Sequence, residues 1–211
     1  MVTTSFKNII KSEEELDSLI GGPSELAKQK VITILDHHCT NFIEHSPFMV
    51  LSTSNSFGQC DVSPRGDAPG FIKVLNDRTM IIPERPGNKR MDSMRNILMN
   101  PHVGLLFFIP GLEETLRVNG KATLITDDEV LEQMAVRGKK PQIGIVVEVE
   151  ECFIHCAKAF KRSKLWEPTT WAPQESLPNA AEIIFEHAKL PGTTSDSIAE
   201  RLAEGYRKRL Y

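Results

Sequence analysis

Basic side chains are concentrated between residues 63 and 95. This stretch holds seven Lys or Arg residues and four acidic residues, although the whole chain of 211 residues has a formal net charge of −3. Within it, Asn88, Lys89 and Arg90 follow the turn Arg85-Pro86-Gly87 and stand at the predicted start of a helix. Unpaired N–H groups at a helix start attract a phosphate, and nearby cations add charge-assisted hydrogen bonds. The pattern predicts a site for a monophosphate that carries a planar organic group.

Arg65 is a further candidate for the same phosphate. It comes at the end of a predicted strand, in the sequence Ser63-Pro64-Arg65-Gly66-Asp67. Charged residues are common at protein surfaces, so charge alone does not define a site. The alternative interpretation of the whole stretch is therefore a solvated basic turn that faces acidic residues of a second subunit.

A polar row is predicted along the strand that contains residues 115–122. Alternation places Thr115, Arg117 and Asn119 on one face of this strand and two apolar residues between them on the other. Such a polar face can form hydrogen bonds with the edge of a heterocycle. The alternative is a face that is simply exposed to solvent.

The segment from His155 to Trp166 contains four cations and a tryptophan directly after an apolar strand. It could bring Arg162 to an anion bound by a partner subunit and place Trp166 beside an aromatic ligand. The alternative is a basic helix that covers the sheet, with Trp166 as a packing residue.

A series of short β-forming segments must position these side chains. Turn residues such as those at 55–58 and 76–78 separate the segments, and one helix is predicted over residues 89–99. Six or seven short strands with one inserted helix predict a mainly β fold with helices (α+β), arranged as a small closed barrel. The predicted strands cover residues 48–53, 59–63, 71–75, 79–83, 102–109, 115–126 and 143–155.

Helical segments flank the predicted barrel. Ser12 and Glu15 have the spacing of a capping box and predict a helix over 12–20, and helical spacing of apolar residues predicts a second helix over 25–45. A short helix is expected over 128–137, and the tail ends in a basic, amphipathic segment at 195–211. We therefore divide the chain into an N-terminal helical segment (1–45), a barrel (46–160) and a C-terminal helical and loop extension (161–211).

Composition and motifs argue against several classes of protein. The chain is 40% hydrophobic and 25% charged, and a weakly negative net charge predicts neither nucleic-acid binding nor attachment to an anionic membrane. Its N-terminus lacks the pattern of a signal peptide, and the longest apolar run, residues 103–109, is too short to cross a bilayer. Four widely spaced cysteines are then expected to be reduced thiols in a cytoplasmic protein.

No metal site is expected. On a helix, the adjacent residues His37, His38 and Cys39 would point in different directions. Cys152 and Cys156 lack the usual Cys-x-x-Cys spacing, so buried thiols are the favoured interpretation.

Taken together, these segments resemble the pyridoxamine 5′-phosphate oxidase-like FMN-binding split barrels, and more closely a subfamily described as FMN-dependent enzymes. The resemblance spans roughly residues 40–170, with the segments in matching order. The segments that carry it are Ser46-Pro47-Phe48, Ser63-Pro64-Arg65-Gly66-Asp67, Arg85-Pro86-Gly87-Asn88-Lys89-Arg90, Arg95-Asn96, Thr115-Leu116-Arg117-Val118-Asn119-Gly120 and residues 155–166.

The resemblance implies a six-stranded split barrel that forms a homodimer, with FMN at the subunit interface. Residues on a barrel strand and at the helix start would hold the phosphate, the strand at 114–117 would lie near the isoalloxazine, and residues 162–166 could reach the flavin from the neighbouring subunit. The cofactor-binding residues that it implies are Arg65, Pro83, Asn88, Lys89, Arg90, Asn96, Glu114, Thr115, Arg117, Arg162 and Trp166.

The sequence departs from the family pattern in two places. Asn88-Lys89-Arg90 stands where the family usually has Ser-Arg-Lys, and the tail does not reproduce the Trp-rich segment that contacts the vitamin substrate in authentic pyridoxamine phosphate oxidases. Vitamin B6 oxidation is therefore not assumed, and the substrate is an unspecified small molecule.

Three functions stay open at this point. The first is an FMN-dependent oxidoreductase in which His155 and Arg162 are the candidates for a proton donor. The second is a non-enzymatic carrier or sensor that binds flavin or haem on the same fold. The third is an interaction protein that uses its basic C-terminal helix, although acidic residues in that helix favour a solvated surface or a dimer arm.

Overall fold

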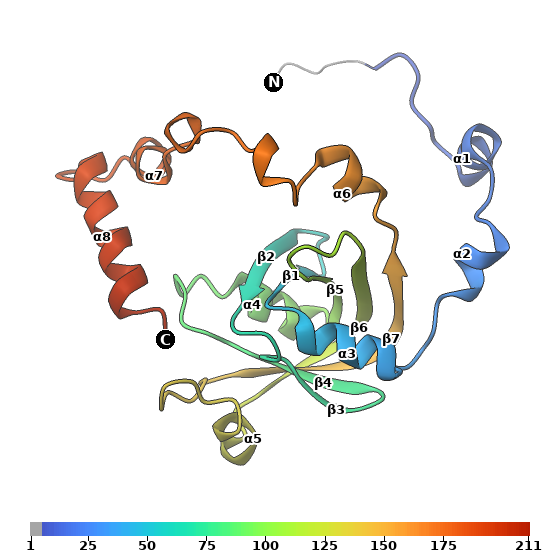
Figure 1. Ribbon diagram of the computed structural model, residues 1–211, viewed down its shortest axis with the longest axis horizontal. Coiled ribbons are helices and arrows are strands. Elements are labelled where there is room, and N and C mark those ends of the chain that lie inside the picture. The colour runs from blue at the N-terminus through green and yellow to red at the C-terminus, as the bar shows by residue number, and fades with distance from the viewer. Residues whose placement is uncertain (1–5) are drawn as a thin grey trace.

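The structure, a computed structural model, describes residues 6–211 and is built around one antiparallel sheet (Figure 1). Seven strands form the sheet in the order β2-β1-β5-β6-β7-β4-β3, where the resemblance implies six. The strands are β1 (Phe48–Ser54), β2 (Cys60–Gly66), β3 (Lys73–Asn76), β4 (Thr79–Pro83), β5 (His102–Phe108), β6 (Thr115–Ile125) and β7 (Gly144–His155). The mixed α+β class and all seven segments predicted from alternation and turns are confirmed.

Helices precede, interrupt and follow the sheet. α3 and α4 lie against it, whereas the helices near the two ends of the chain extend away from it (Figure 1). The α-helices are α1 (Glu13–Ile20), α2 (Glu25–Gln29), α3 (His37–His45), α4 (Asp92–Met99), α5 (Asp128–Glu132), α6 (Lys158–Ser163), α7 (Ala180–Ala188) and α8 (Ser195–Lys208). No helix among residues 6–211 has the length and apolar character needed to cross a membrane.

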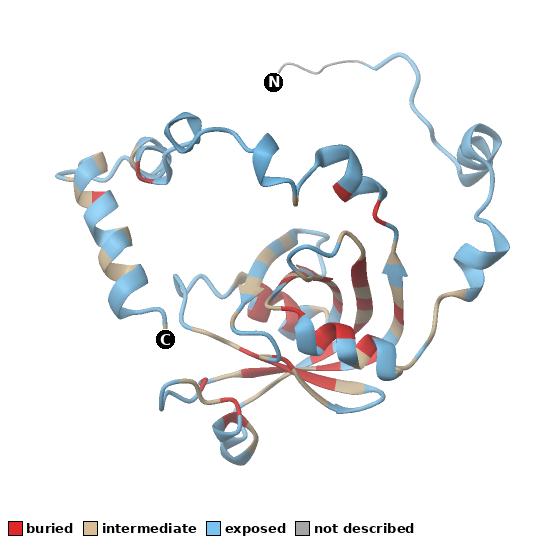
Figure 2. Ribbon diagram, viewed as in Figure 1, coloured by how far each residue is buried: buried red, intermediate tan, exposed pale blue. Residues whose placement is uncertain are grey.

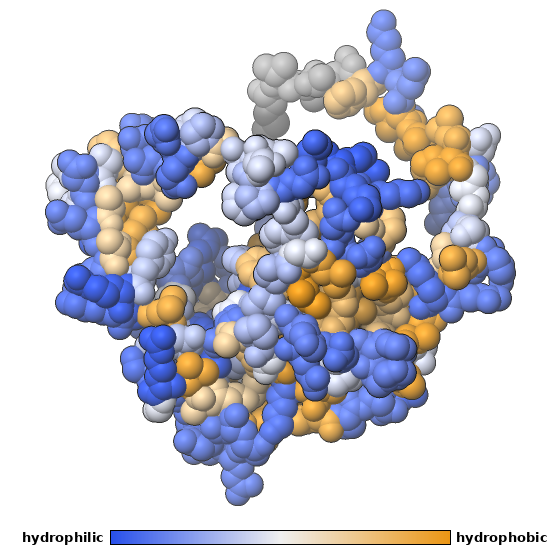
Figure 3. All heavy atoms as spheres, in the orientation of Figure 1, coloured by the Kyte–Doolittle hydropathy of each residue, from blue (hydrophilic) through white to orange (hydrophobic). Residues whose placement is uncertain are grey.

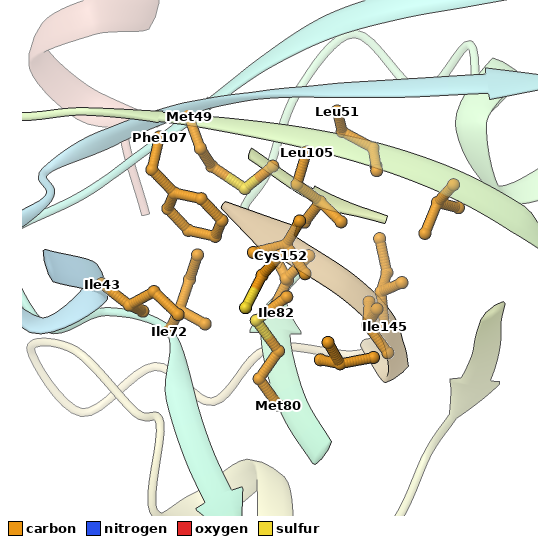
Figure 4. Close-up of a cluster of buried hydrophobic side chains, with 14 of the residues drawn as sticks. Ile43, Met49, Leu51, Ile72, Met80, Ile82, Leu105, Phe107, Ile145 and Cys152 are labelled. Atoms are coloured by element: carbon orange, nitrogen blue, oxygen red, sulfur yellow. The ribbon is translucent and has the colours of Figure 1, made fainter. Parts of the chain in front are cut away.

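The core lies inside the curl of the sheet. Alternate residues of β1 and β5 point inward, so that Met49, Leu51, Leu105 and Phe107 are almost completely buried (Figure 4). Residues of β4, β6 and β7 join the same cluster, and α3 and α4 add apolar side chains to it. Burial of this apolar surface is the main force that holds the sheet in its curved form.

The curl of the sheet is not closed by backbone hydrogen bonds. The strand order leaves β2 and β3 as the two edges, and no ladder joins them among the described residues. Two ion pairs cross the split instead: Arg65 of β2 pairs with Glu84, and Asp67 pairs with Arg85. The chain therefore forms a barrel-like sheet with a side-chain closure next to the loop that follows β4.

The predicted helix over 25–45 is wrong in its middle part. The structure has two separate helices there, α2 and α3, because Ile32 leaves the helix and its backbone pairs with that of Cys152 on β7. The β-branched run Val31-Ile32-Thr33-Ile34 favours this extended conformation. Asp36 then starts α3 as its N-cap, accepting a hydrogen bond from the N–H of Cys39.

The helix predicted over 89–99 begins three residues later than expected. Lys89 and Met91 both have a φ of 62°, in the left-handed region, so the chain cannot be helical before Asp92. Asn88, Lys89 and Arg90 consequently lie in the loop before α4 rather than in its first turn. The short helix expected over 128–137 also ends early, at Glu132.

The helices near the two ends of the chain are mostly exposed. α1 and α2 bury no side chain, α7 buries Ala181 and α8 buries Ile198 (Figure 2). Hydrophobic residues are visible on the surface of the N-terminal arm, which runs from residue 6 to residue 30 (Figure 3). The three-part division of the chain made from the sequence stays a prediction.

All four cysteines are free thiols, as expected, but the prediction of a buried thiol is wrong for Cys156, which is exposed. Cys39 of α3 and Cys152 of β7 are buried with their Sγ atoms 3.5 Å apart, and Cys152 also donates to the carbonyl oxygen of Ile34 over 3.1 Å. These contacts help to fix α3 against the sheet.

Gly120 offers a test of the sheet geometry. A bulge interrupts the β6–β7 register at Asn119 and Gly120, and a Cβ atom on Gly120 would collide with the carbonyl oxygen of Glu148. We expect Gly120→Ala to lower the free energy of unfolding by about 3 kcal/mol, as overpacking against backbone does. Gly104→Ala is the control, because its Cβ would meet no atom closer than 3.4 Å. Equal urea midpoints for the two variants would contradict the bulge.

Candidate functional site

Arg65 lies at the centre of a polar cluster next to the split. One guanidinium N–H group donates to the carboxylate of Glu84, and Nη2 donates to Oγ of Ser93 over 2.9 Å and to Oγ of Ser63 over 3.3 Å. Oγ of Ser93 donates in turn to Asp61 over 2.6 Å. The Nε atom of Arg65 is buried and has no hydrogen-bond partner among the described residues. One donor of this guanidinium is therefore still available.

Glu84 forms the ion pair with Arg65, but its surroundings stabilise the charged carboxylate less than is usual in an ion pair. Burial raises the pKa of Glu84 above its ordinary value of 4.5, and the charge and hydrogen bond of Arg65 offset only part of this effect. The charged form of this carboxylate is thus destabilised by its surroundings.

A second cluster lies next to the first. Nε of Arg85 donates to Asp67 over 2.6 Å, and the hydroxyl of Tyr211 donates to the other carboxylate oxygen over 2.6 Å. The guanidinium carbons of Arg85 and Arg137 lie 5.8 and 5.2 Å from the centre of the Tyr211 ring. Tyr211 therefore connects the C-terminal segment to the split through both polar and cation–π contacts.

The pKa of Asp67 moves in the opposite direction to that of Glu84. Burial is the largest single influence and by itself would raise the pKa of Asp67, but several groups stabilise the charged carboxylate. Hydrogen bonds from Tyr211, from the N–H of Ala68 and from Arg85, together with the charge of Arg85, bring the pKa below its ordinary value of 3.8. The Asp67–Arg85 pair is thus the more stable of the two pairs that close the split.

The loop between the clusters and α4 has an open, strained backbone. Lys89 and Met91 adopt left-handed conformations that non-glycine residues rarely take, and such strain tends to gather at functional sites. Met91 is the N-cap of α4 and makes no side-chain capping bond, so the first N–H groups of the helix lack a capping acceptor. Arg90 forms an exposed ion pair with Asp92 over 2.7 Å.

Pro83 and Asn96 have structural contacts in this chain. Pro83 is the buried last residue of β4 and pairs with Gly144 of β7. Nδ2 of Asn96 donates to Oγ1 of Thr53 over 3.0 Å, which attaches α4 to β1. Neither side chain is hydrogen-bonded to the Arg65 cluster in the part of the chain that the structure describes.

Arg117 belongs to a separate cluster on β6 and β7. Its guanidinium lies 4.4 Å from the centre of the Phe153 ring and donates to Glu151 over 2.8 Å. Asn119 donates to the same carboxylate oxygen of Glu151, also over 2.8 Å. The Nε atom of Arg117 is buried and lacks a partner within residues 6–211.

His155 extends this cluster at the end of β7. Burial lowers the pKa of His155 from its ordinary value of 6.5, and the charges of Arg117 and Lys30 lower it further. The imidazole is therefore mainly neutral at pH 7, so one ring nitrogen can accept a hydrogen bond or bind a metal ion.

The remaining predicted residues lie around α6. Thr115 is buried and Glu114 is half-buried, whereas Arg162 is exposed on α6. Nε1 of Trp166 donates to the carbonyl oxygen of Leu112 over 2.9 Å, and its ring packs against Phe160. Within one chain Trp166 thus makes packing contacts, which was the alternative interpretation of this residue.

The predicted phosphate and ring residues lie on opposite faces of the sheet. Arg65 is paired in register with Met49, whose side chain points into the core. Arg117 is paired with Leu106, which is paired with Val50, the neighbour of Met49 on the opposite face. Because side chains alternate along a strand, Arg65 lies on the inner face and Arg117 on the outer face. One protomer cannot bring both guanidinium groups together.

Two open cavities lie near these clusters. The larger, of about 700 Å³, is bordered by residues 67–76, by residues 133–136 and by Arg85, on one side of the Asp67–Arg85 pair. The smaller, of about 350 Å³, is a hollow lined by Ser52, Gly104 and Asn119 and their neighbours. Its floor includes the row Ser52-Gly104-Asn119 across β1, β5 and β6, so it opens on the same outer face as Arg117.

Comparison with known proteins decides the family. A profile of the family described as pyridoxamine 5′-phosphate oxidase matches residues 35–156, more than half of the chain. The chain belongs to this family. The match to the pyridoxamine 5′-phosphate oxidase family includes both Arg65 and Arg117, whereas Trp166 and Tyr211 lie beyond it.

No curated protein matches the chain. Solved structures with a similar fold exist, but their sequence identity to this chain is low. HupZ of Group A Streptococcus is 18% identical, with 57% of this chain and 99% of that chain covered and a TM-score of 0.48. An FMN-binding protein of Syntrophomonas wolfei is 11% identical, with 56% and 88% covered and a TM-score of 0.43. HutZ, the haem storage protein of Vibrio cholerae, is 16% identical, with 57% and 93% covered and a TM-score of 0.42.

Sequence reasoning missed several residues of these clusters, among them Glu84, Ser93 and Tyr211. Glu84 and Ser93 meet Arg65 from 19 and 28 residues away, and Tyr211 meets Asp67 across 144 residues. The acidic residues inside the basic stretch were a usable signal for Glu84, because each is a potential partner for a nearby cation. Nothing in the sequence pattern indicated the contact of Tyr211.

Asp67→Asn tests the closure of the split. Removing one partner of a buried ion pair should lower the free energy of unfolding at pH 7 by about 3 kcal/mol. Because the folded protein holds the pKa of Asp67 below 3.8, this stability is present above that pH and is lost as the pH falls through the lowered value. The difference between wild type and variant, measured by urea unfolding, should therefore shrink below pH 3.8.

Asp92→Asn provides the matched control. It removes the same charge from the exposed pair with Arg90 and should change the stability by less than about 1 kcal/mol. A loss for Asp67→Asn that stays constant down to pH 2 would contradict the assigned pair.

Proposed function

We propose that this chain is an FMN-binding flavoprotein that acts as an FMN-dependent oxidoreductase on a small-molecule substrate. The observation that carries the proposal is the Arg65 cluster, where a largely buried guanidinium with an unpaired Nε lies beside the loop before α4. Ser63 and Ser93 supply hydroxyl groups at the same point. A phosphate monoester is the ligand whose charge and several acceptor oxygens suit this set of donors.

The loop before α4 would complete the phosphate site. Asn88, Lys89 and Arg90 are exposed there, and the N–H groups of the first turn of α4 have no capping side chain. A phosphate can accept from such N–H groups, and Lys and Arg add positive charge. Arg65, Lys89 and Arg90 are therefore the residues that we expect to hold the phosphate of FMN.

The outer-face cluster is suited to the flavin ring. Arg117 has a buried, unpaired Nε, and the hollow beside Asn119 is open because Gly104 has no side chain. Bound FMN would supply the hydride chemistry, while the protein supplies binding, orientation and charge. Arg117 would place a positive charge beside the ring, and the neutral imidazole of His155 could hold or accept a proton at its free nitrogen.

A homodimer follows from this assignment. Arg65 and Arg117 lie on opposite faces of one sheet, so a single FMN can contact both only if they come from different protomers. Two-fold symmetry would then create two equivalent sites at the interface. We therefore propose that each FMN lies between the phosphate residues of one protomer and the ring residues of its partner.

The exposed surface of one chain supports association. The accessible area is 14859 Å², whereas a compact monomer of 23.7 kDa has about 9,800 Å². The excess is about 5,000 Å², and large apolar side chains of the N-terminal arm such as Leu19, Ile20 and Leu26 are exposed. Stable homodimers bury about 2,000–5,000 Å² in total, so the exposed surface of this chain is large enough for a dimer interface.

Arg65→Ala tests the phosphate site. The loss of charge-assisted hydrogen bonds is worth about 1.5–3 kcal/mol, so FMN should bind about ten- to hundredfold more weakly. Riboflavin, which has no phosphate, should bind with nearly unchanged affinity in a fluorescence titration. Arg207→Ala, in the exposed part of α8, is the control for loss of one positive charge. Unchanged FMN affinity in folded Arg65→Ala would rule out this site.

Mixed dimers test the shared site. Arg65→Ala and Arg117→Ala should each weaken FMN binding when expressed alone. Co-expressed, they should form heterodimers in which one of the two sites has both arginines, so about one quarter of all sites should regain wild-type affinity. Recovery should be measured from bound flavin after gel filtration. No recovery in dimers that do contain both variants would show that the two arginines do not share a flavin.

Haem binding is the second candidate, and His155 is the observation that favours it. A half-buried, mainly neutral imidazole beside Phe153 is suited to bind a haem iron. Titration with haem should then give a Soret band that disappears in His155→Ala, while FMN binding persists. Absence of the band, together with tight FMN binding, would leave the flavin function alone.

A further inference from the structure

We propose that Glu84 is a built-in competitor for the phosphate at Arg65, and that it makes the site selective for ligands with a phosphate group. The inference rests on the proposed FMN function and adds a residue that regulates the site. The phosphate would replace the Glu84 carboxylate at the guanidinium, and the released side chain would turn toward solvent. No other change in the ion-pair arrangement of the split is needed.

The contacts of Arg65 define the competition. Its guanidinium has one charged partner, Glu84, while Ser63 and Ser93 are neutral acceptors. The Arg65 and Glu84 side chains are only 14% and 18% exposed, so water screens this pair poorly. An incoming phosphate must therefore meet a guanidinium that already has a carboxylate bound to it.

Glu84 is placed so that its side chain can leave. Its backbone is fixed, because its N–H donates to the carbonyl oxygen of Ile143 over 2.9 Å, next to the last pair of β4 and β7. Its carboxylate accepts from Arg65 alone among the described residues. A rotation of the side chain would break a single ion pair and would leave the strand in place.

The energetics favour exchange. The pKa of Glu84 is raised chiefly by burial, so the ion pair does not fully offset the cost of keeping this charge out of water. A phosphate monoester has more charge and three acceptor oxygens, so it can bind Arg65 and also accept from the uncapped N–H groups of α4. Ligands without a phosphate gain nothing from displacing Glu84.

The neighbouring pair provides the contrast. Asp67 accepts from Arg85, Tyr211 and the N–H of Ala68, and its pKa is lowered. Displacing Asp67 would break three hydrogen bonds, including the one from the hydroxyl of Tyr211. The Asp67–Arg85 pair should therefore stay formed when a ligand binds, whereas the Glu84–Arg65 pair can be replaced by a bound anion.

Flavin titrations of Glu84→Gln test the inference. The amide keeps the shape of the side chain but removes the competing charge, so the Kd for FMN should fall about tenfold, while the Kd for riboflavin should stay the same. Glu84→Ala should shift FMN affinity in the same direction. Glu204→Gln is the matched control, because it removes one negative charge from an exposed pair with Lys208 on α8. It should leave both affinities unchanged.

The outcomes separate this inference from the proposed function. If the wild type binds FMN and folded Glu84→Gln binds it equally or more weakly, Glu84 orients Arg65 and the competition is overturned. A crystal structure of the wild type with FMN decides the matter even if the variants do not fold. Glu84 turned away from Arg65 supports the inference, and Glu84 still paired with it overturns it. A folded wild type that binds neither flavin would instead overturn the proposed function.

Discussion

The ion pairs across the split are the contacts on which the candidate phosphate site depends. A sheet of seven strands has two edges, and within residues 6–211 no backbone ladder joins β2 to β3. Arg65–Glu84 and Asp67–Arg85 close the gap with side chains alone. Charges removed from water are costly unless each has a partner, so the closure is firm only where hydrogen bonds surround the acid. Asp67 meets this condition and Glu84 does not. The split is therefore closed by one stable ion pair, Asp67–Arg85, and by one pair, Arg65–Glu84, in which a ligand can replace the carboxylate.

The alternation of side chains along the strands explains why the site is divided. Residues that point inward on β2 meet α4 and the loop before it, and residues that point outward on β6 meet Phe153 and Glu151. The interior of the curled sheet is filled by a cluster of apolar side chains. The FMN that is proposed to contact both Arg65 and Arg117 would therefore lie between two copies of the chain. Under this proposal, association is a condition for a complete site.

Short-range rules predicted the strands well because alternation, turn residues and β-branched runs act within a few residues. They failed over residues 25–45, where the pairing of Ile32 with Cys152 overrides helical spacing. They also placed the start of α4 too early, since the left-handed conformations of Lys89 and Met91 follow from how the loop is held at both ends. The candidate arginines were found because their charge is unusual locally. Glu84, Ser93 and Tyr211 were missed because their roles come from contacts between distant parts of the chain.

In the proposed function, Arg65 serves both closure of the split and phosphate binding, and this dual use has a physical consequence. If Arg65 had no partner in the free protein, a nearly buried charge would be left uncompensated, and the split would tend to open. A carboxylate that is itself destabilised by burial solves this problem, because it stabilises the arginine and can still be replaced. The affinity for the ligand is then lower than the bare guanidinium would allow. In return, the edge strand β2 stays in position before the ligand arrives, so binding does not have to order it.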